Sequence, residues 1–168
     1  MKISSTGGRK TAFDFEFQSL KGKPMPLKEF AGKPVIIVNT ASKCGFTPQY
    51  KGLEEVWQRH KAEGLVVLGV PSNDFAGQEP GNSLEIAEFC EINFGVDFPL
   101  TEKVHVKGSD AHPLFKWIGK QGGFLARPRW NFYKYFIGRD GELKDWFASI
   151  TPPDSAKFER AVEKLLKN

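Results

Sequence analysis

Residues 35–70 read VIIVNTASKCGFTPQYKGLEEVWQRHKAEGLVVLGV, and this stretch decides the fold of the chain. It opens and closes with runs of apolar, largely β-branched residues, 35–40 and 66–70, which are typical of strands buried on both faces of a sheet. Between the runs, Thr47 predicts a helix N-cap and Pro48 predicts the first helical position, where a missing N–H costs nothing. A strand, a helix and a strand in this order predict a right-handed βαβ unit with two parallel strands.

The segments around this unit predict a mixed sheet. Alternating apolar and polar residues, followed by turn residues, predict a β-hairpin near the start of the chain. An Asn-x-x-Glu capping box predicts one of the later helices, and the turn sequence Arg-Asp-Gly predicts a second hairpin. The expected elements are the hairpin over 13–28, a helix from Asn82, a helix over 112–120, strands over 131–138 and 142–148, and a helix over 154–166. Their order predicts an α/β fold in which a central mixed β-sheet has helices on both faces.

Length and composition indicate one domain over residues 1–168. A chain of 168 residues with 40% hydrophobic content can form one sizeable core, and no linker, repeat or low-complexity stretch divides it. No window approaches the roughly 18 apolar residues of a membrane span. The basic N-terminus has no apolar stretch behind it, so it does not read as a signal peptide. We therefore expect a cytoplasmic protein with no stable membrane insertion, although a removed export signal would leave no trace in this sequence.

The charge pattern argues against nucleic acid as a partner. The formal net charge is +4, but the 24 Lys and Arg residues are interleaved with 20 Asp and Glu residues along the chain. No run of like charges and no nucleic-acid motif accompanies this balance, so a solvated surface is expected. The three histidines are scattered and the two cysteines are far apart in sequence, so no metal site is expected. Two cysteines are also too few for a disulfide scaffold.

Cys44 lies where an α/β fold places its reactive groups. It follows the buried strand 35–40 in a Ser-Lys-Cys-Gly loop, just before the predicted helix. Ligands of open α/β sheets bind beyond the carboxyl ends of the strands, and a helix N-terminus favours negative charge. Both features favour a thiolate, the reactive form of cysteine, and the neighbouring Lys43 can add to them. A cysteine in a soluble protein is most often a small buried apolar residue, but that role is expected inside a strand or on an apolar helix face, so a reactive role fits Cys44 better.

Several long stretches of the chain resemble the glutathione peroxidase family. They are VNTASKCGFTPQYKGLEE at 38–55, NDFAGQEPG at 73–81, EIAEFCEINFGVDFPL at 85–100 and WNFYKYFIGRDG at 130–141. With the matching order of segments, the resemblance covers nearly the whole chain. It implies a thioredoxin-like fold and an antioxidant peroxidase that reduces hydrogen peroxide and organic hydroperoxides in the response to oxidative stress. It also implies that the protein uses no metal and no bound organic cofactor.

By motif match, the resemblance implies three residues that support Cys44, namely Gln78, Trp130 and Asn131. A thiolate that attacks a peroxide needs donors for its own charge and for the departing alkoxide. The two side-chain amides and the indole N–H are neutral donors, so they can serve both purposes without forming a competing ion pair. Taken alone, Trp130 can be a core residue and Asn131 a turn cap. Gln78 has no obvious structural task in its Gly- and Pro-rich loop.

Cys90 has two interpretations. It lies on the apolar face of a predicted helix, where a buried structural cysteine is ordinary. The cysteine-only, thioredoxin-dependent branch of the family, however, has its resolving cysteine in the same Glu-Phe-Cys context. The resemblance therefore implies that Cys44 is oxidised to a sulfenic acid and that Cys90 condenses with it to a disulfide. A disulfide needs Cα atoms within about 7 Å, and we expect a larger separation in the reduced fold, so that residues 82–93 have to unwind locally.

The chain departs from the family pattern at several positions. Position 44 is cysteine rather than selenocysteine. Where the family usually has Pro-Cys-Asn-Gln-Phe, residues 71–75 read Pro-Ser-Asn-Asp-Phe. Ser72 removes an alternative disulfide partner, and Asp74 would disfavour the thiolate if its carboxylate pointed toward Cys44. The short segment 117–130 lacks the insertion that tetrameric relatives use at their interface, so we expect a monomer.

Several functions stay open for such a chain. The first is a peroxidase recycled by thioredoxin through Cys90, and the second is a peroxidase recycled by glutathione with Cys90 silent. A third is a peroxide sensor that passes the oxidation of Cys44 to a partner protein as a disulfide. A binding module without turnover is disfavoured by the complete set of Cys, Gln, Trp and Asn. The chain lacks a C-x-x-C motif, so it is not itself a thioredoxin.

Overall fold

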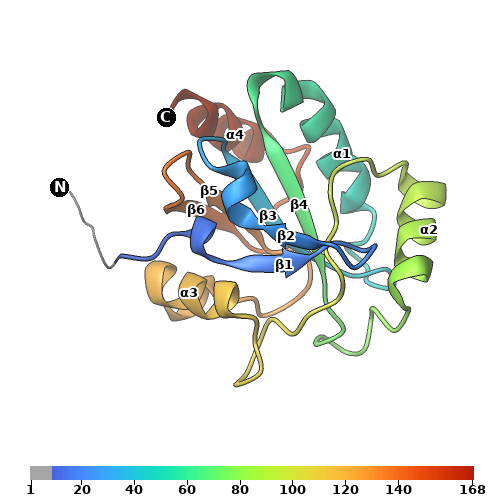
Figure 1. Ribbon diagram of the computed structural model, residues 1–168. Helices are drawn as coiled ribbons and strands as arrows, with labels where there is room; N and C mark the ends of the chain where they lie inside the picture. The colour runs from blue at the N-terminus through green and yellow to red at the C-terminus, as the bar shows by residue number, and fades with distance from the viewer. Residues whose placement is uncertain (1–8) are drawn as a thin grey trace.

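The fold is built on a mixed sheet (Figure 1). The computed structural model describes residues 9–168, and in this part the sheet has four strands. They are β3 (Val35–Thr40), β4 (Val66–Pro71), β5 (Lys134–Ile137) and β6 (Leu143–Phe147). The order across the sheet is β4-β3-β5-β6, in which β3 pairs with β4 in parallel, and the other pairs are antiparallel. Every residue of β3 and β4 is buried, as their apolar runs predict.

Helices cover both faces of this sheet (Figure 1). They are α1 (Gln49–His60), α2 (Ser83–Phe94), α3 (Pro113–Gly122) and α4 (Ala156–Lys167). Side chains of α1, α2 and α4 pack on one face, where β3 contributes Ile36 and Val38. Side chains of α3 pack on the other face, where β3 contributes Val35 and Ile37. The two-residue period of the strand therefore separates two cores, one on each side of the sheet.

A short N-terminal hairpin completes the face that α3 covers. Its strands are β1 (Glu16–Gln18) and β2 (Pro24–Pro26), which pair antiparallel and confirm the hairpin expected over 13–28. The Phe17 ring stacks on His112, the N-cap of α3, with 3.9 Å between the ring centroids. Short 3-10 helices link the elements, and they are η1 (Ala12–Asp14), η2 (Leu27–Phe30), η3 (Lys61–Glu63) and η4 (Phe124–Ala126).

The start of α1 differs from the prediction. Pro48, not Thr47, is the N-cap, and the helix begins at Gln49. The Thr47 hydroxyl is used elsewhere, because it donates to the carbonyl of Ala41 (2.8 Å) and accepts the N–H of Cys44 (2.9 Å). A side-chain oxygen that closes the preceding loop in this way does not cap the helix, so the prediction of Thr47 as the N-cap is wrong.

The later elements are confirmed, with some shifted ends. Asn82 caps α2 through a reciprocal capping box with Glu85, as the sequence predicts. The strand expected over 131–138 begins only at Lys134, because Phe132 has a φ of +63° and cannot continue an extended strand. The β5–β6 hairpin and the final helix α4 lie close to their expected places.

Candidate active site

Cys44 lies in the tight loop that connects β3 to α1. The Thr47 hydroxyl bridges this loop, and the Thr47 N–H donates back to the Cys44 carbonyl (3.0 Å). The Phe46 N–H donates to the Cys44 sulfur (Sγ) at 3.4 Å. Cys44 is 8% exposed, so it is buried but still reaches the surface. A backbone donor at the sulfur is placed to stabilise negative charge that develops there during a reaction.

The loop after β4 brings Gln78 to the same place. Ala76 and Gly77 both have positive φ angles, +57° and +62°, and this left-handed pair turns the chain just before Gln78. The Lys43 N–H donates to the Gln78 carbonyl (3.0 Å), which joins the two loops next to Cys44. A non-glycine residue such as Ala76 is strained in this conformation, and such strain is common at functional sites.

Asn131 holds the Gln78 side chain. The Asn131 amide N–H donates to the Gln78 side-chain oxygen (Oε1) at 2.9 Å, so two loops that are far apart in sequence meet here. Asn131 is fully buried, and the Ser149 hydroxyl donates to its backbone carbonyl. Because Gln78 Oε1 already accepts a hydrogen bond, the amide nitrogen is the part of this side chain that is left to donate. The pair therefore has the chemistry of a neutral donor site.

The segment that carries Trp130 is fixed on the end of β3 by Asn39. The Asn39 side chain donates to the Trp130 carbonyl (2.9 Å), and the Asn39 backbone carbonyl accepts the Phe132 N–H (2.6 Å). The Trp130 ring is half-buried and packs on Phe75, with 5.8 Å between the ring centroids. Trp130 therefore contacts the loop that carries Gln78.

The structure brings these predicted residues to one end of the sheet. Hydrogen bonds link the Cys44 loop to Gln78 and Gln78 to Asn131, and ring packing links Trp130 to the same loop. That these side chains donate to the Cys44 sulfur during a reaction stays a prediction.

The Asp74 carboxylate binds donors of the segment 105–107. It lies 2.7 Å from His105 Nδ1 and accepts the N–H groups of Val106 (2.7 Å) and Lys107 (3.2 Å). Burial opposes the charge, but the hydrogen bonds outweigh it, so the pKa of Asp74 lies below its ordinary value. The same carboxylate raises the pKa of His105. The charge of Asp74 is thus engaged by donors, and it ties this segment to the active-site loop.

Cys90 is buried in the core that α1, α2 and α4 form on the sheet. Burial raises the pKa of its thiol to about 11, while the nearby Tyr50 hydroxyl acts to lower this pKa and the charge of Glu79 acts to raise it. The Tyr50 hydroxyl lies beside the thiol without a hydrogen bond of good geometry. Cys44 belongs to the same core cluster, and both cysteines are free thiols. In the folded helix at neutral pH, Cys90 is therefore a protonated and unreactive thiol.

A buried carboxyl group next to Gln78 was missed by the sequence reasoning. Glu79 is 1% exposed, and burial raises its pKa, although Ser42 and the charge of Lys103 partly offset this effect. Within the described residues, Glu79 Oε2 has no hydrogen-bond partner. Lys103 Nζ donates to the carbonyls of Glu79 (3.0 Å) and Gly81 (2.9 Å) and so fixes this part of the loop. A glutamate in a Gly- and Pro-rich loop is usually solvent-exposed. The only sequence signal that Glu79 belongs to the candidate active site is its position directly after Gln78.

Two further findings concern residues 9–168. No group of at least three His, Cys, Asp or Glu side chains in this part of the chain is placed to hold a metal ion. No helix in it has the length and apolar composition that crossing a membrane requires.

The sequence matches known proteins along most of its length. Residues 12–119, more than half of the chain, match the family model described as glutathione peroxidase. The chain belongs to the glutathione peroxidase family. It is 49% identical to the glutathione peroxidase-like peroxiredoxin GPX5 of Chlamydomonas reinhardtii over 150 residues, which cover 88% of this chain and 91% of that protein. It is 45% identical to the hydroperoxy fatty acid reductase gpx1 of Synechocystis sp. over 164 residues, which cover 93% of this chain and 96% of that protein.

Solved structures agree with this assignment to the glutathione peroxidases. The crystal structure of Trgpx in its apo form is 40% identical and aligns with a TM-score of 0.77 over 96% of this chain and 98% of that chain. A thioredoxin-family thiol:disulfide interchange protein from Chlorobium tepidum is only 17% identical but aligns with a TM-score of 0.68 over 96% and 99% of the two chains. This second likeness shows the fold alone, and it confirms the thioredoxin-like fold. As a member of the family, the protein is a peroxidase, an oxidoreductase that reduces hydroperoxides.

Proposed function

We propose that Cys44 is the residue with which this glutathione peroxidase reduces its hydroperoxide. The Cys44 thiolate attacks one oxygen of ROOH, so that an S–O bond forms and the O–O bond breaks. The sulfur becomes a sulfenic acid, and the departing alkoxide takes up a proton and leaves as the alcohol. Gln78, Trp130 and Asn131 donate hydrogen bonds to the sulfur and to the departing oxygen. The observation that carries this proposal is the hydrogen bond between Asn131 and Gln78 (2.9 Å), next to the Cys44 loop.

Cys90 is the resolving residue in this proposal. Its sulfur attacks the Cys44 sulfenic acid, an S–S bond forms, the S–O bond breaks, and water leaves with the Cys90 proton. Because Cys90 is buried in α2, this helix has to open before the attack. The last turn of α2 has no basic residue and contains Glu91, whose negative charge opposes the helix dipole there. Local opening of α2 is therefore favoured over opening of the fully buried central strands.

The outer surface of α2 suits a protein as the reductant. Leu84 and Ile92 are 69% and 79% exposed, although both are large apolar side chains. Exposed apolar groups near a disulfide can be covered by a protein partner, whereas glutathione is small and charged. Thioredoxin is therefore the proposed reductant, and glutathione and a sensor role are the alternatives.

Turnover with two reductant systems tests this proposal. Hydrogen peroxide is supplied with thioredoxin and its reductase in one assay, and with glutathione and its reductase in the other. We expect turnover with thioredoxin that Cys44→Ser abolishes and Cys90→Ser strongly reduces. Turnover with glutathione alone, unchanged in Cys90→Ser, would favour the second candidate. Slow turnover in both assays, together with mixed disulfides to other proteins, would favour the sensor.

The remaining parts of the proposal concern substrates and surroundings. The Synechocystis relative is named a hydroperoxy fatty acid reductase, so organic hydroperoxides with long chains belong among the substrates to test. Both cysteines are free thiols, which suits the reducing cytoplasm. A monomer is proposed, because α3 and η4 take up most of the segment 117–130, which has no added interface loop. No nucleic-acid partner is proposed, because basic and acidic residues are interleaved along the chain.

A further inference from the structure

The turn 148–151, which follows β6, is connected to the candidate active site by a short chain of hydrogen bonds. The Ser149 side chain is buried, and its hydroxyl donates to the backbone carbonyl of Asn131. The Asn131 side chain in turn donates to Gln78 Oε1 (2.9 Å). A turn that lies outside the motifs around Cys44, Gln78 and Trp130 is therefore only two hydrogen bonds away from Gln78.

Lys134, the first residue of β5, holds this turn in place. Its ammonium nitrogen (Nζ) donates to the carbonyls of residues 148 (3.3 Å), 149 (3.2 Å) and 151 (2.7 Å). An ammonium group has three N–H donors, so all three are used on the backbone of the turn. Lys134 is fully buried and forms no ion pair with any residue in 9–168. The polar contacts of this side chain therefore serve the turn and no acidic partner.

Gln49 attaches the same turn to the helix that follows the Cys44 loop. Gln49 is the first residue of α1, and its side-chain amide nitrogen donates to the Ser149 carbonyl (2.7 Å). This carbonyl thus accepts hydrogen bonds from β5, through Lys134, and from α1. The position of Ser149 is fixed relative to the sheet and to the start of the helix at the same time.

Asn131 needs such support because it lies outside the sheet. The strand β5 begins only at Lys134, since the positive φ of Phe132 interrupts the extended backbone. On one side, the Phe132 N–H donates to the carbonyl of Asn39 at the end of β3 (2.6 Å). On the other side, the Ser149 hydroxyl binds the Asn131 carbonyl. The place of the Asn131 side chain is therefore set by these contacts and not by strand pairing.

We propose that Lys134 and Ser149 are positioning residues for the reduction of the hydroperoxide. They fix the backbone of Asn131 and so hold the pair of Asn131 and Gln78 where it donates to the Cys44 sulfur and to the departing oxygen. Neither residue touches the peroxide, so both act through Asn131. A misplacement of about 1 Å in such a donor costs much of the rate. This inference rests on the proposed function of Cys44.

The rate of Cys44 oxidation tests the inference. Rapid mixing of the reduced protein with hydrogen peroxide measures the second-order rate constant of this step. Ser149→Ala should lower the rate constant about fivefold, because one hydrogen bond between neutral groups contributes roughly that factor. Ser149→Thr keeps the hydroxyl and should retain the parent rate. Lys134→Met releases the whole turn and should lower the rate constant about tenfold or more, and Ser149→Ala still decides the matter if Lys134→Met does not fold.

Ser155→Ala is the matched control for a loss of stability alone. The Ser155 hydroxyl accepts the N–H of Phe158 as the N-cap of α4 and donates to the carbonyl of Pro152. Its removal deletes the same hydroxyl group only a few residues from Ser149 and weakens a helix cap. Ser155→Ala should therefore lower the free energy of unfolding in urea while leaving the rate constant of Cys44 oxidation unaltered. An equal loss of rate in Ser149→Ala and Ser155→Ala would reduce the role of Ser149 to stability and overturn the inference.

A double-mutant cycle tests whether Ser149 acts through Asn131. Asn131→Ala removes the side chain that Ser149 is proposed to hold, so adding Ser149→Ala to it should lower the rate constant little further. If Ser149→Ala lowers the rate constant by the same factor with and without Asn131, Ser149 acts by another route and the inference is wrong.

Nuclear magnetic resonance separates this inference from the proposed function. The side-chain amide signals of Asn131 and Gln78 report their positions without any turnover. They should shift in Ser149→Ala and stay in place in Ser155→Ala. A parent protein whose Cys44 does not react with hydrogen peroxide would contradict the proposed function, and the amide signals would then decide whether Ser149 positions Asn131. A reactive parent with an unchanged rate constant in Ser149→Ala would overturn the inference alone.

Discussion

The rate of disulfide formation should depend on pH in a way that shows whether α2 opens. In the folded helix the pKa of Cys90 is about 11, so at pH 7 about one Cys90 thiol in ten thousand is ionised. A cysteine in an open, solvated segment has a pKa of about 8.5, so that about one thiol in thirty is ionised at pH 7. Opening α2 therefore raises the reactive fraction of Cys90 by about 300-fold.

Rapid mixing with one equivalent of hydrogen peroxide, followed by acid quenching and mass spectrometry, measures this rate between pH 6 and 10. If α2 opens first, the rate should rise about tenfold per pH unit and level off at about pH 8.5. Glu91→Lys places a positive charge in the last turn of α2 and should stabilise the helix by about 0.5–1 kcal/mol, which slows disulfide formation about two- to fivefold. Glu55→Lys makes the same charge change on α1 and should leave the rate unaltered. A rate that keeps rising beyond pH 10, or that ignores Glu91→Lys, would refute the opening of α2.

Three further substitutions test packing and buried charge. Gly69→Ala places a Cβ atom 2.4 Å from Leu100 Cδ2, so it should lower the free energy of unfolding in urea by about 1–3 kcal/mol; an unchanged value would show that Leu100 moves freely. The raised pKa of Glu79 means that the folded state loses stability as this buried carboxyl ionises above its ordinary value of 4.5. Glu79→Gln should therefore gain stability relative to the parent as the pH rises above 4.5, and equal pH profiles would contradict this. Lys134 Nζ donates to the carbonyls of residues 148, 149 and 151, so Lys134→Met should cost about 3 kcal/mol or more and lower the Tm, while an unchanged Tm would show that these bonds add nothing.

The central part of the fold is predictable because its signals are local. The buried runs 35–40 and 66–70 are continuous in sequence, and a parallel pair follows directly from the helix between them. The capping box at Asn82 also depends on residues within one helical turn. Thr47 shows the limit of such signals, because a threonine before a helix can bond forward to the helix or backward to the loop. The choice depends on the fold of the Cys44 loop, which composition alone does not reveal.

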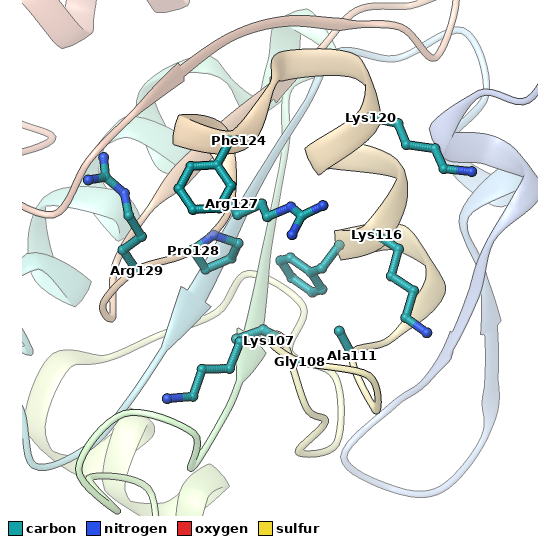
Figure 2. Close-up of a pocket in the computed structure, with 11 residues that line it drawn as sticks. Lys107, Gly108, Ala111, Lys116, Lys120, Phe124, Arg127, Pro128 and Arg129 are labelled. Carbon is teal, nitrogen blue, oxygen red and sulfur yellow. The ribbon is translucent and has the colours of Figure 1, made fainter.

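Position in the βαβ unit indicated Cys44, but Gln78, Trp130 and Asn131 were indicated only by motif match, and the residues around them could not be predicted from the sequence. Gln78 and Asn131 are 53 residues apart, and their hydrogen bond depends on where two loops end on the sheet. Glu79 is buried by the packing of its loop, against the usual preference of glutamate for solvent. Lys107, Lys116, Lys120, Arg127 and Arg129 all lie within residues 107–129, but that they line one pocket (Figure 2) depends on how α3 and the loops beside it fold.

Peptide mapping after one equivalent of hydrogen peroxide tests the central claim most directly. The account predicts one linked pair of peptides that contains Cys44 and Cys90, absent when Cys44 is replaced by serine and restored to two free thiols by thioredoxin. It would be contradicted by a protein in which Cys90 stays free while Cys44 is oxidised beyond the sulfenic acid, or in which Cys44 does not react with the peroxide at all.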